Sequence, residues 1–275
     1  MLFKKIYLYK LNMSNLPIDL ILIRHGESER NLIGKNKEII FDEEEYNSIH
    51  SSKFRLTEEG RKQSIITGEY IKENISNNFD KYYTSDYIRT KETAALLNLE
   101  NALWESDFLI RERDNGVLSG LSDIQKEILY PNEILRKKQN LFYFAPIGGE
   151  SISNVCLRVE LFLSLLSRNA SNMRVIVVTH GHVLRSFRIR LEKMNHNEIE
   201  ELYKEENKTI LNTQIIYYSR KNPNTNEISS NLKYRKMVCP WNLEEYNEDW
   251  VTLKKNNLLS NQDLLDSIQD VKHIL

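Results

Sequence analysis

Two short apolar segments of the chain each end in a histidine followed by a glycine. Residues 20–23 lead into Arg-His-Gly at 24–26, and residues 175–178 lead into Thr-His-Gly at 179–181. Short runs of Leu, Ile and Val are typical of buried strands. In open α/β sheets, ligands bind beyond the carboxyl ends of the strands. We therefore expect the two histidines to converge on one site, although they are far apart in sequence.

An imidazole beside a fixed cation and a helix start would bind an anion. Arg24 carries a guanidinium whose forked donors match phosphate oxygens. A helix that begins after each His-Gly pair, at Gly26 and Gly181, adds backbone N–H donors and the positive end of its dipole. A phosphoryl group is the natural occupant of such a site. His25, if neutral, is then placed to act as a nucleophile.

The elements that must position these residues alternate between strands and helices. Alternation of this kind predicts an α/β fold, with a mostly parallel sheet and helices on both faces. Strands are expected at residues 19–24, 79–84, 107–110, 173–179, 210–218 and 231–239. Helices are expected at 26–32, after an N-cap at Thr57, after Ser85 or Asp86, at 121–144 with an interruption at Pro131, at 153–168, and after His180.

The ends of the chain differ from its middle in composition. We expect residues 1–17 to be an N-terminal extension, 18–239 the α/β domain, and 240–275 a C-terminal tail. The tail is Leu-rich and contains Trp241 and Trp250, which predicts a helix docked on the domain or on a partner. Residues 34–55 are polar and acidic, and long connections of this kind are often functional loops.

Bulk composition favours an ordinary soluble protein. Of 275 residues 28% are charged, and the formal net charge is −1, which gives no sign of a nucleic-acid or membrane-surface partner. No apolar run reaches the length of a membrane-spanning helix. The two cysteines, Cys156 and Cys239, have no neighbouring cysteine, so we expect both to be reduced in a cytoplasmic protein.

Several further segments, in order along the chain, resemble the motifs of the histidine phosphatase superfamily, whose fold is phosphoglycerate-mutase-like. The resemblance covers about residues 18–219. It rests on Arg-His-Gly-Glu-Ser at 24–28 with Asn31, Leu-Thr-Glu-Glu-Gly-Arg-Lys-Gln at 56–63, the segment 83–94 with Arg89, the acid-bearing loop 110–116, Gly-Gly-Glu-Ser at 148–151, and Thr-His-Gly at 179–181.

The resemblance implies a role for each residue. His25 would attack phosphorus and form a phosphohistidine, and Glu112 would serve as general acid and then as general base. Arg24, Arg89 and His180 would bind the non-bridging oxygens, which removes the need for a metal or another cofactor. Asn31, Gly181 and His182 would complete the phosphate and substrate contacts.

Other interpretations of these residues stay open. Asp114 lies in the same loop as Glu112 and could be the acid, and Glu112 could instead form a surface salt bridge. His182 could lie at the edge of the substrate or in the exposed first turn of its helix. His25, His180 and His182 could be zinc ligands, although Arg24 and Arg89 disfavour a bound cation. His50, His196 and His273 lie in polar stretches and are expected to be solvated.

The family contains phosphatases and mutases, and this chain resembles the phosphatases more. Residues 34–55 lack the tryptophan of the mutase loop, and Arg-Lys-Lys at 136–138 stands where mutases carry paired arginines. We therefore expect a histidine acid-type phosphatase acting on a small phosphorylated substrate. The alternatives are a mutase that depends on 2,3-bisphosphoglycerate and a catalytically silent phosphate-binding or scaffold protein. A homodimer would be in keeping with the family.

Overall fold

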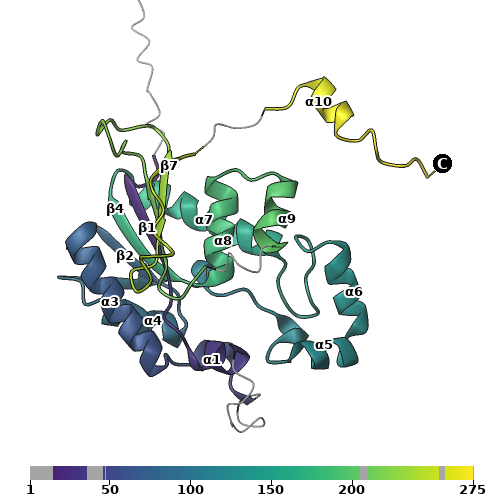
Figure 1. Cartoon of the computed structure of the whole chain (residues 1–275), viewed down its shortest axis with the longest axis horizontal. Helices are drawn as coiled ribbons and strands as arrows, with labels where there is room; N and C mark the ends of the chain where they lie inside the picture. The colour runs from purple at the N-terminus through teal and green to yellow at the C-terminus, as the bar shows by residue number, and fades with distance from the viewer. Residues whose placement is uncertain (1–14, 36–45, 47, 205–209, 254–257, 275) are drawn as a thin grey trace, which may run out of the picture.

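The strand that ends in His25 lies in the middle of the sheet. The structure is a computed structural model and describes residues 15–35, 46, 48–204, 210–253 and 258–274. In these residues one seven-stranded sheet has the order β3-β2-β4-β1-β5-β6-β7 (Figure 1). The strands are β1 (Asp19–Arg24), β2 (Lys81–Thr84), β3 (Trp104–Ser106), β4 (Arg174–Thr179), β5 (Ile215–Ser219), β6 (Tyr234–Val238) and β7 (Val251–Thr252).

The sheet is mixed, and its direction changes at β1. Strands β3, β2, β4 and β1 pair in parallel, whereas β5, β6 and β7 run antiparallel to their neighbours. The predicted α/β fold is confirmed. In the register of β1 with β4, Arg24 lies opposite Thr179, so His25 and His180 leave the sheet at the same edge.

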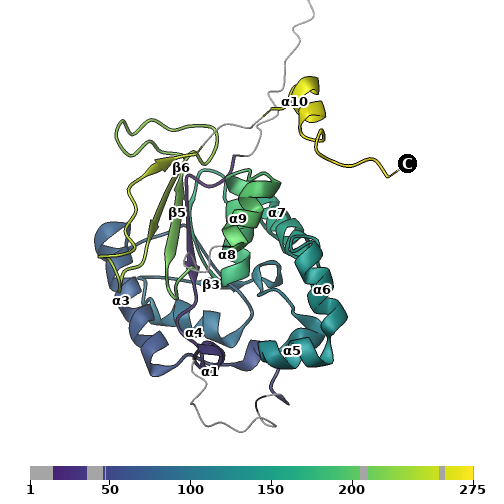
Figure 2. The same cartoon turned by 45° about the vertical axis from the view of Figure 1, so that its right-hand side comes forward.

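Helices cover both faces of the sheet (Figures 1 and 2). The face with α3 (Glu58–Asn74) and α4 (Ile88–Leu96) is opposite the face with α7 (Ile152–Asn169), α8 (Gly181–Leu191) and α9 (His196–Lys204). Three shorter helices lie beyond the carboxyl end of β1: α1 (Glu29–Lys35), α5 (Asp123–Leu129) and α6 (Pro131–Gln139). The break between α5 and α6 falls at Pro131, as predicted.

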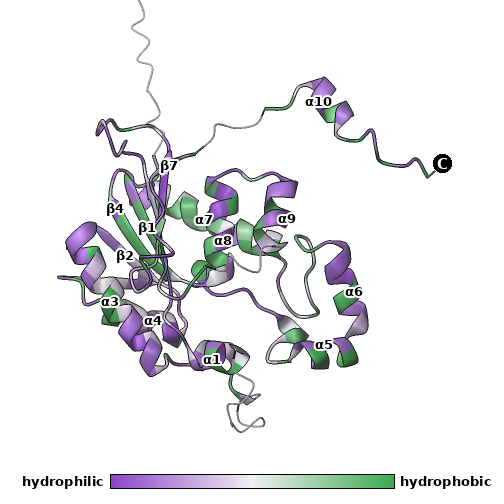
Figure 3. Cartoon of the chain, in the orientation of Figure 1, coloured by the Kyte–Doolittle hydropathy of each residue, from purple (hydrophilic) through white to green (hydrophobic). Residues whose placement is uncertain are grey.

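The side chains of β1 alternate between two cores. Leu20 and Leu22 pack in the cluster that contains Phe162 of α7 and Phe187 of α8, whereas Ile21 and Ile23 pack in the other. All four β1 side chains are fully buried. A strand that is covered on both faces needs a continuous apolar run, and Figure 3 shows β1 and β4 as the hydrophobic centre.

One predicted strand and two predicted element starts are wrong. The strand expected at 210–218 begins only at Ile215, because Gln214 N donates to Leu211 O and closes a turn before it. Residues 107–110 do not form a strand, because the Asp107 side chain accepts a hydrogen bond from Leu109 N (2.7 Å) and begins the 3-10 helix η2 (Phe108–Ile110). The first helix begins at Glu29 instead of residue 26. Ser28 forms a bridge with Leu56, and its backbone N–H donates to Asn31 Oδ1, which delays the helix.

The tail is only partly helical. Trp241 Nε1 donates to Asn212 O (2.8 Å), Trp250 packs edge-on against Tyr217, and β7 extends the sheet beside β6. The helix α10 (Asn261–Asp266) is exposed along its length. Most of the predicted extension at 1–17 lies outside the described residues, and the division into three segments stays a prediction. No described helix has the length and apolar character needed to cross a membrane.

Candidate active site

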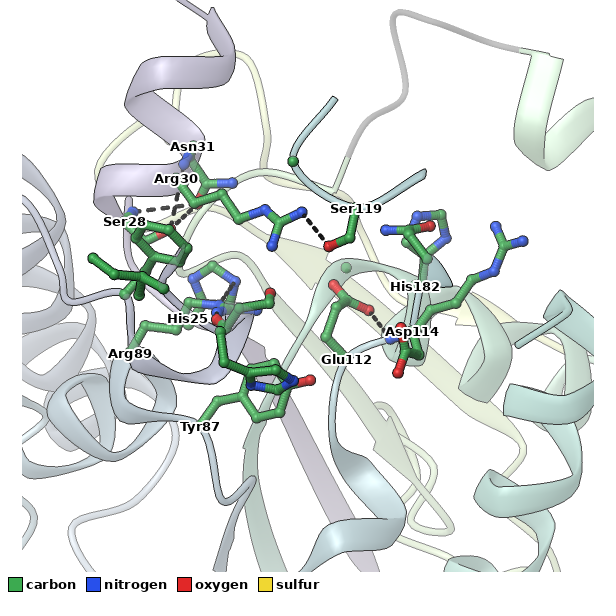
Figure 4. A pocket seen from close by; sticks show the side chains of 18 of the residues that line it. His25, Ser28, Arg30, Asn31, Tyr87, Arg89, Glu112, Asp114, Ser119 and His182 are labelled. Atoms are coloured by element: carbon green, nitrogen blue, oxygen red, sulfur yellow. Dashed lines mark hydrogen bonds between the residues drawn. The ribbon is translucent and has the colours of Figure 1, made fainter. Parts of the chain in front are cut away.

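The residues predicted to act on a phosphoryl group meet in one cavity of about 730 Å³. It lies beyond the carboxyl ends of β1 and β4, and Figure 4 shows its lining. Seven of the eight predicted site residues line it: Arg24, His25, Asn31, Arg89, Glu112, Gly181 and His182. The eighth, His180, lies directly behind, with its ring centre 5.2 Å from that of His25.

His25 is held in the orientation and tautomer that a nucleophile requires. Its Nδ1 lies 2.7 Å from the carbonyl oxygen of Gly26, which can only accept, so Nδ1 carries the proton. Nε2 therefore keeps its lone pair and accepts a hydrogen bond from Arg89 Nε (3.1 Å). The side chain is 2% exposed. The lone pair of His25 thus points toward the Arg89 guanidinium.

Two guanidinium groups flank His25, each tied to the backbone at one end. Arg89 Nη1 donates to Ser51 O (2.6 Å), and Arg24 Nη1 donates to Ile210 O (2.6 Å). Burial lowers the pKa of each guanidinium to about 10, so both are still charged at neutral pH. Arg24 Nε is buried and has no hydrogen-bond partner in the described part of the chain. These donors can bind an anion without moving far.

Burial and the arginines keep the two site histidines neutral. The pKa of His25 lies well below its usual value because the ring is buried and because Arg89 and Arg24 are close. The same causes, burial first and then Arg89, lower the pKa of His180. A neutral imidazole is the reactive form of a histidine nucleophile. His25 therefore needs no deprotonation before it attacks.

Ser85 orients His180, which is fully buried. The Ser85 hydroxyl lies 2.9 Å from His180 Nε2. A hydroxyl that donates to Nε2 leaves the proton of the neutral ring on Nδ1. His180 Nδ1 is buried and has no partner among the described residues. When the Ser85 proton is directed to His180 Nε2 and not to Asp86 Oδ1 (3.3 Å), His180 Nδ1 carries a proton that it can donate to a ligand.

Glu112 and Asp114 are the two candidates for the general acid, and Glu112 projects into the cavity. Glu112 Oε1 accepts from Arg113 N (2.8 Å), and no described residue forms an ion pair with this carboxylate. Asp114 is exposed, and its Oδ1 accepts from Gly116 N (2.8 Å). Figure 4 shows Glu112 between His25 and His182. The geometry favours Glu112 as the acid over Asp114 and over a surface salt bridge.

Asn31 and His182 lie at opposite sides of the cavity. Asn31 Oδ1 accepts from Ser28 N (3.2 Å) and Ser28 Oγ (3.0 Å), which leaves its amide NH₂ to donate. The His182 ring stacks on Tyr203, and burial lowers its pKa to about 4. Its Nδ1 is buried, which favours the interpretation at the substrate edge over an exposed first turn.

The sequence patterns assign no site role to several residues around the cavity. Arg30, Ser119 and Arg185 line it, and Ser85, predicted only as a helix cap within the segment 83–94, contacts His180 behind it. Arg185 could have been suspected, because it follows His182 by three positions on a helix and shares its face. Ser119 offered no signal. His50 was expected to be solvated; it is exposed and lies at the rim.

The described residues contain no group of three His, Cys, Asp or Glu side chains with the geometry of a metal site. His25 and His180 instead lie beside two buried guanidinium groups. Electrostatic repulsion from these guanidinium groups disfavours a metal cation and favours an anion. The set of donors on His180, Arg24, Arg89 and Asn31 suits the oxygens of a phosphoryl group.

Comparisons with known proteins identify phosphoglycerate mutases and phosphatases as relatives of this chain. The sequence is 29% identical over 189 residues to a 2,3-bisphosphoglycerate-dependent phosphoglycerate mutase of Methylobacterium radiotolerans, covering 66% of this chain and 83% of that one. It is 28% identical over 172 residues to phosphoserine phosphatase 1 of Hydrogenobacter thermophilus, covering 62% and 74%.

Solved structures show the same fold at low identity. The α-ribazole phosphatase of Shigella flexneri has a TM-score of 0.59 at 20% identity, covering 77% of this chain and 96% of that one. A mycobacterial glucosyl-3-phosphoglycerate phosphatase has a TM-score of 0.57 at 22% identity, covering 73% and 92%. The sequence pattern described as "Histidine phosphatase superfamily (branch 1)" matches residues 20–215. Because this span runs from β1 to β5 and includes both histidine motifs, the chain belongs to that superfamily.

Proposed function

We propose that the protein is a phosphatase that hydrolyses phosphomonoesters through a phosphohistidine on His25, without a metal. The observation that carries this proposal is the single tautomer of His25. Its Nδ1–H donates to Gly26 O, its Nε2 lone pair faces the buried Arg89 guanidinium, and the Arg24 cation lies close by. That arrangement combines a neutral nucleophile with fixed positive charge for a phosphoryl dianion.

In the first step, the Nε2 lone pair of His25 attacks phosphorus as the bond to the leaving oxygen breaks. Arg24, Arg89 and His180 hold the three non-bridging oxygens. The oxygen that binds Arg89 displaces the hydrogen bond from Arg89 Nε to Nε2 and frees the lone pair. Protonated Glu112 gives its proton to the leaving alcohol. Positive charge that develops on the imidazole is stabilised at Nδ1 by Gly26 O.

In the second step, water takes the position that the alcohol has left. The Glu112 carboxylate removes a proton from this water as its oxygen attacks phosphorus. The bond between phosphorus and Nε2 then breaks, which returns His25 to its neutral form and releases inorganic phosphate. Each step uses the same donors, so the arginines do not have to rearrange between them.

The test compares His25→Ala with His273→Ala, which changes an exposed histidine of the tail. With 4-nitrophenyl phosphate, we expect His25→Ala to lower kcat by at least about 10³-fold. An alkaline quench, which preserves phosphohistidine, should trap labelled phosphate on the unchanged protein and on His273→Ala only. Activity retained in His25→Ala, or label on another residue, would contradict the mechanism. Chelating agents should leave the rate unchanged, whereas a loss would indicate a metal.

A phosphoglycerate mutase is the second candidate, favoured by the mutase relatives at 29% identity. A mutase must hold a bisphosphate and return its second phosphoryl group to the substrate. Incubation with 3-phosphoglycerate and a catalytic amount of 2,3-bisphosphoglycerate separates the two activities. Formation of 2-phosphoglycerate without inorganic phosphate would identify a mutase. We expect release of inorganic phosphate instead.

A further inference from the structure

A second cavity of about 980 Å³ adjoins the first, and Arg89 lines only the first. The two share wall residues, which include Arg113, His182 and Arg185. The second cavity is enclosed by α5 and α6 on one side and by α8 and α9 on the other. An alcohol that leaves past Glu112 would extend from the first cavity into this second one.

The charge of the second cavity is strongly positive. Five cationic side chains line it: Arg30, Arg113, Lys126, Lys137 and Arg185. Asp123 is the one carboxylate among the lining residues, and it pairs with Lys126 (2.8 Å). Lys137 has no ion-pair partner among the residues that the structure describes, and desolvation, Lys126 and Arg113 lower its pKa. The cavity therefore holds more positive charge than the protein itself neutralises.

Polar atoms without partners also lie in this wall. His182 Nδ1 and the Tyr203 hydroxyl are both buried, and neither has a hydrogen-bond partner in the described chain. The two rings stack with an interplanar angle of 16°, and the Arg185 guanidinium lies 4.9 Å from the centre of the Tyr203 ring. Buried polar groups normally have partners, so these atoms are arranged for a polar ligand.

Part of the remaining lining is apolar, with side chains such as Ile134, Leu141 and Phe144. Inorganic phosphate alone would not need this surface. A ligand with a carbon skeleton and an anionic end would use both parts. The skeleton would cover the apolar side chains, and the charged end would lie near Lys137 and Arg185.

We propose that the substrate is a phosphomonoester whose alcohol part carries a second anionic group, bound in the second cavity by Lys137, Arg185 and Tyr203. This inference names the substrate class for the proposed phosphatase and rests on that function. The second anionic group is either a carboxylate or a second phosphate, and the carbon skeleton separates it from the phosphate ester.

The test uses alkylphosphonates of three to eight carbons that end in a carboxylate, a phosphonate or a neutral carboxamide. Phosphonates are not hydrolysed, so calorimetry measures binding independently of catalysis. We expect Kd to be at least about tenfold lower for the best charged ligand than for its carboxamide counterpart. The difference should shrink as salt is added. The preferred chain length then reports the distance between the two subsites, and the preferred anion distinguishes carboxylate from phosphate.

Lys137→Met and Lys138→Met provide the matched variants, because the two residues are neighbours on α6 and only Lys137 lines the cavity. Lys137→Met should reduce the preference for the charged ligand severalfold, and Lys138→Met should preserve it. Equal Kd values for charged and neutral ligands would overturn the inference and leave the phosphatase proposal intact. A preference for the charged ligand in a protein that hydrolyses no phosphate ester would support the subsite and contradict the phosphatase.

Discussion

The carboxylate of Glu112 lines the cavity, and its Oε1 accepts a hydrogen bond from Arg113 N. In the proposed mechanism it protonates the leaving oxygen. A general acid matters only when the leaving group is basic. An alkoxide needs a proton in order to leave, whereas 4-nitrophenolate leaves without one. A comparison of two substrates can therefore distinguish proton donation by Glu112 from a purely structural role.

We expect Glu112→Gln to lower the rate of phosphorylation by an alkyl phosphate about 10²–10⁴-fold and to lower the rate of phosphorylation by 4-nitrophenyl phosphate far less. Asp114→Asn, changed at the exposed neighbour, should affect both substrates by less than about tenfold. Single-turnover rates of phosphorylation give the measurement. If Asp114→Asn, and not Glu112→Gln, selectively slows phosphorylation by the alkyl phosphate, Asp114 is the acid. If Glu112→Gln slows phosphorylation equally with both substrates, proton donation by Glu112 is excluded.

At the scale of elements, the loop after β1 and the start of α3 are in direct backbone contact. A Cβ on Gly60 would lie 2.0 Å from Glu27 O, and a Cβ on Gly26 would lie 2.3 Å from Gly60 O. Thr57 N also donates to Glu27 O (2.9 Å). Because both glycines have ordinary backbone angles, it is the close approach that excludes a side chain. The position of His25 therefore depends on α3.

Gly60→Ala should destabilise the protein by about 1–3 kcal/mol, because the added methyl group forces the loop and α3 apart. The same shift should lower kcat/KM. Gly34→Ala is the control, since a Cβ there meets nothing within 4 Å and alanine favours helix α1. Urea unfolding and steady-state kinetics of the two variants provide the comparison. A Gly60→Ala protein with unchanged stability would show that the contact is not rigid.

For the whole molecule, three neutral histidines, two lining the cavity and one behind it, make stability depend on pH. His25, His180 and His182 all have a pKa below the usual value of 6.5, chiefly through burial. The unfolded chain therefore binds more protons than the native protein below pH 6.5. Stability is fully present above pH 6.5 and is lost as the pH falls toward the pKa values of the native state.

We expect the free energy of unfolding to fall by up to about 4 kcal/mol per pH unit below pH 6, which is about 1.4 for each histidine. Urea titrations at pH 7.5, 6.0 and 5.0 measure the slope. His182→Gln should reduce that slope by about a third, whereas His273→Gln, at an exposed position, should not change it. A constant free energy between pH 7.5 and 5.0 would mean that these histidines are protonated in the native state.

Local pattern was enough to predict the centre of the molecule. The runs that form β1 and β4 are apolar throughout because both sheet faces are covered, and the two His-Gly pairs mark their carboxyl ends. Asp107 was harder to interpret, because its capping of a 3-10 helix depends on one hydrogen bond to Leu109 N. At positions of this kind, a side-chain hydrogen bond to the backbone can favour a turn over the strand that the apolar pattern predicts.

The residues of the second cavity could not be predicted from the sequence, for a different reason. Tyr203 and Lys137 lie on separate helices, α9 and α6, and no short sequence motif indicates that both face the second cavity. Ser85 was visible in its motif, but its bond to His180 spans 95 positions. Contacts of this kind arise from tertiary structure. A sequence pattern therefore predicts the chemistry of the first cavity more readily than the substrate group that we propose for the second.

The hydrogen bonds around His25 have a consequence for the order in which the chain folds. The bond from Arg89 to His25 spans 64 positions, and those from Arg24 to Ile210 and from Asn212 to His25 O span 186 and 187. Loops of this length are closed late, because entropy opposes them until the sheet forms. Helices can therefore form in a refolding chain well before it binds phosphate. A nascent chain that has not yet reached residue 212 carries both site histidines and both arginines, but it lacks the last segment that holds them together.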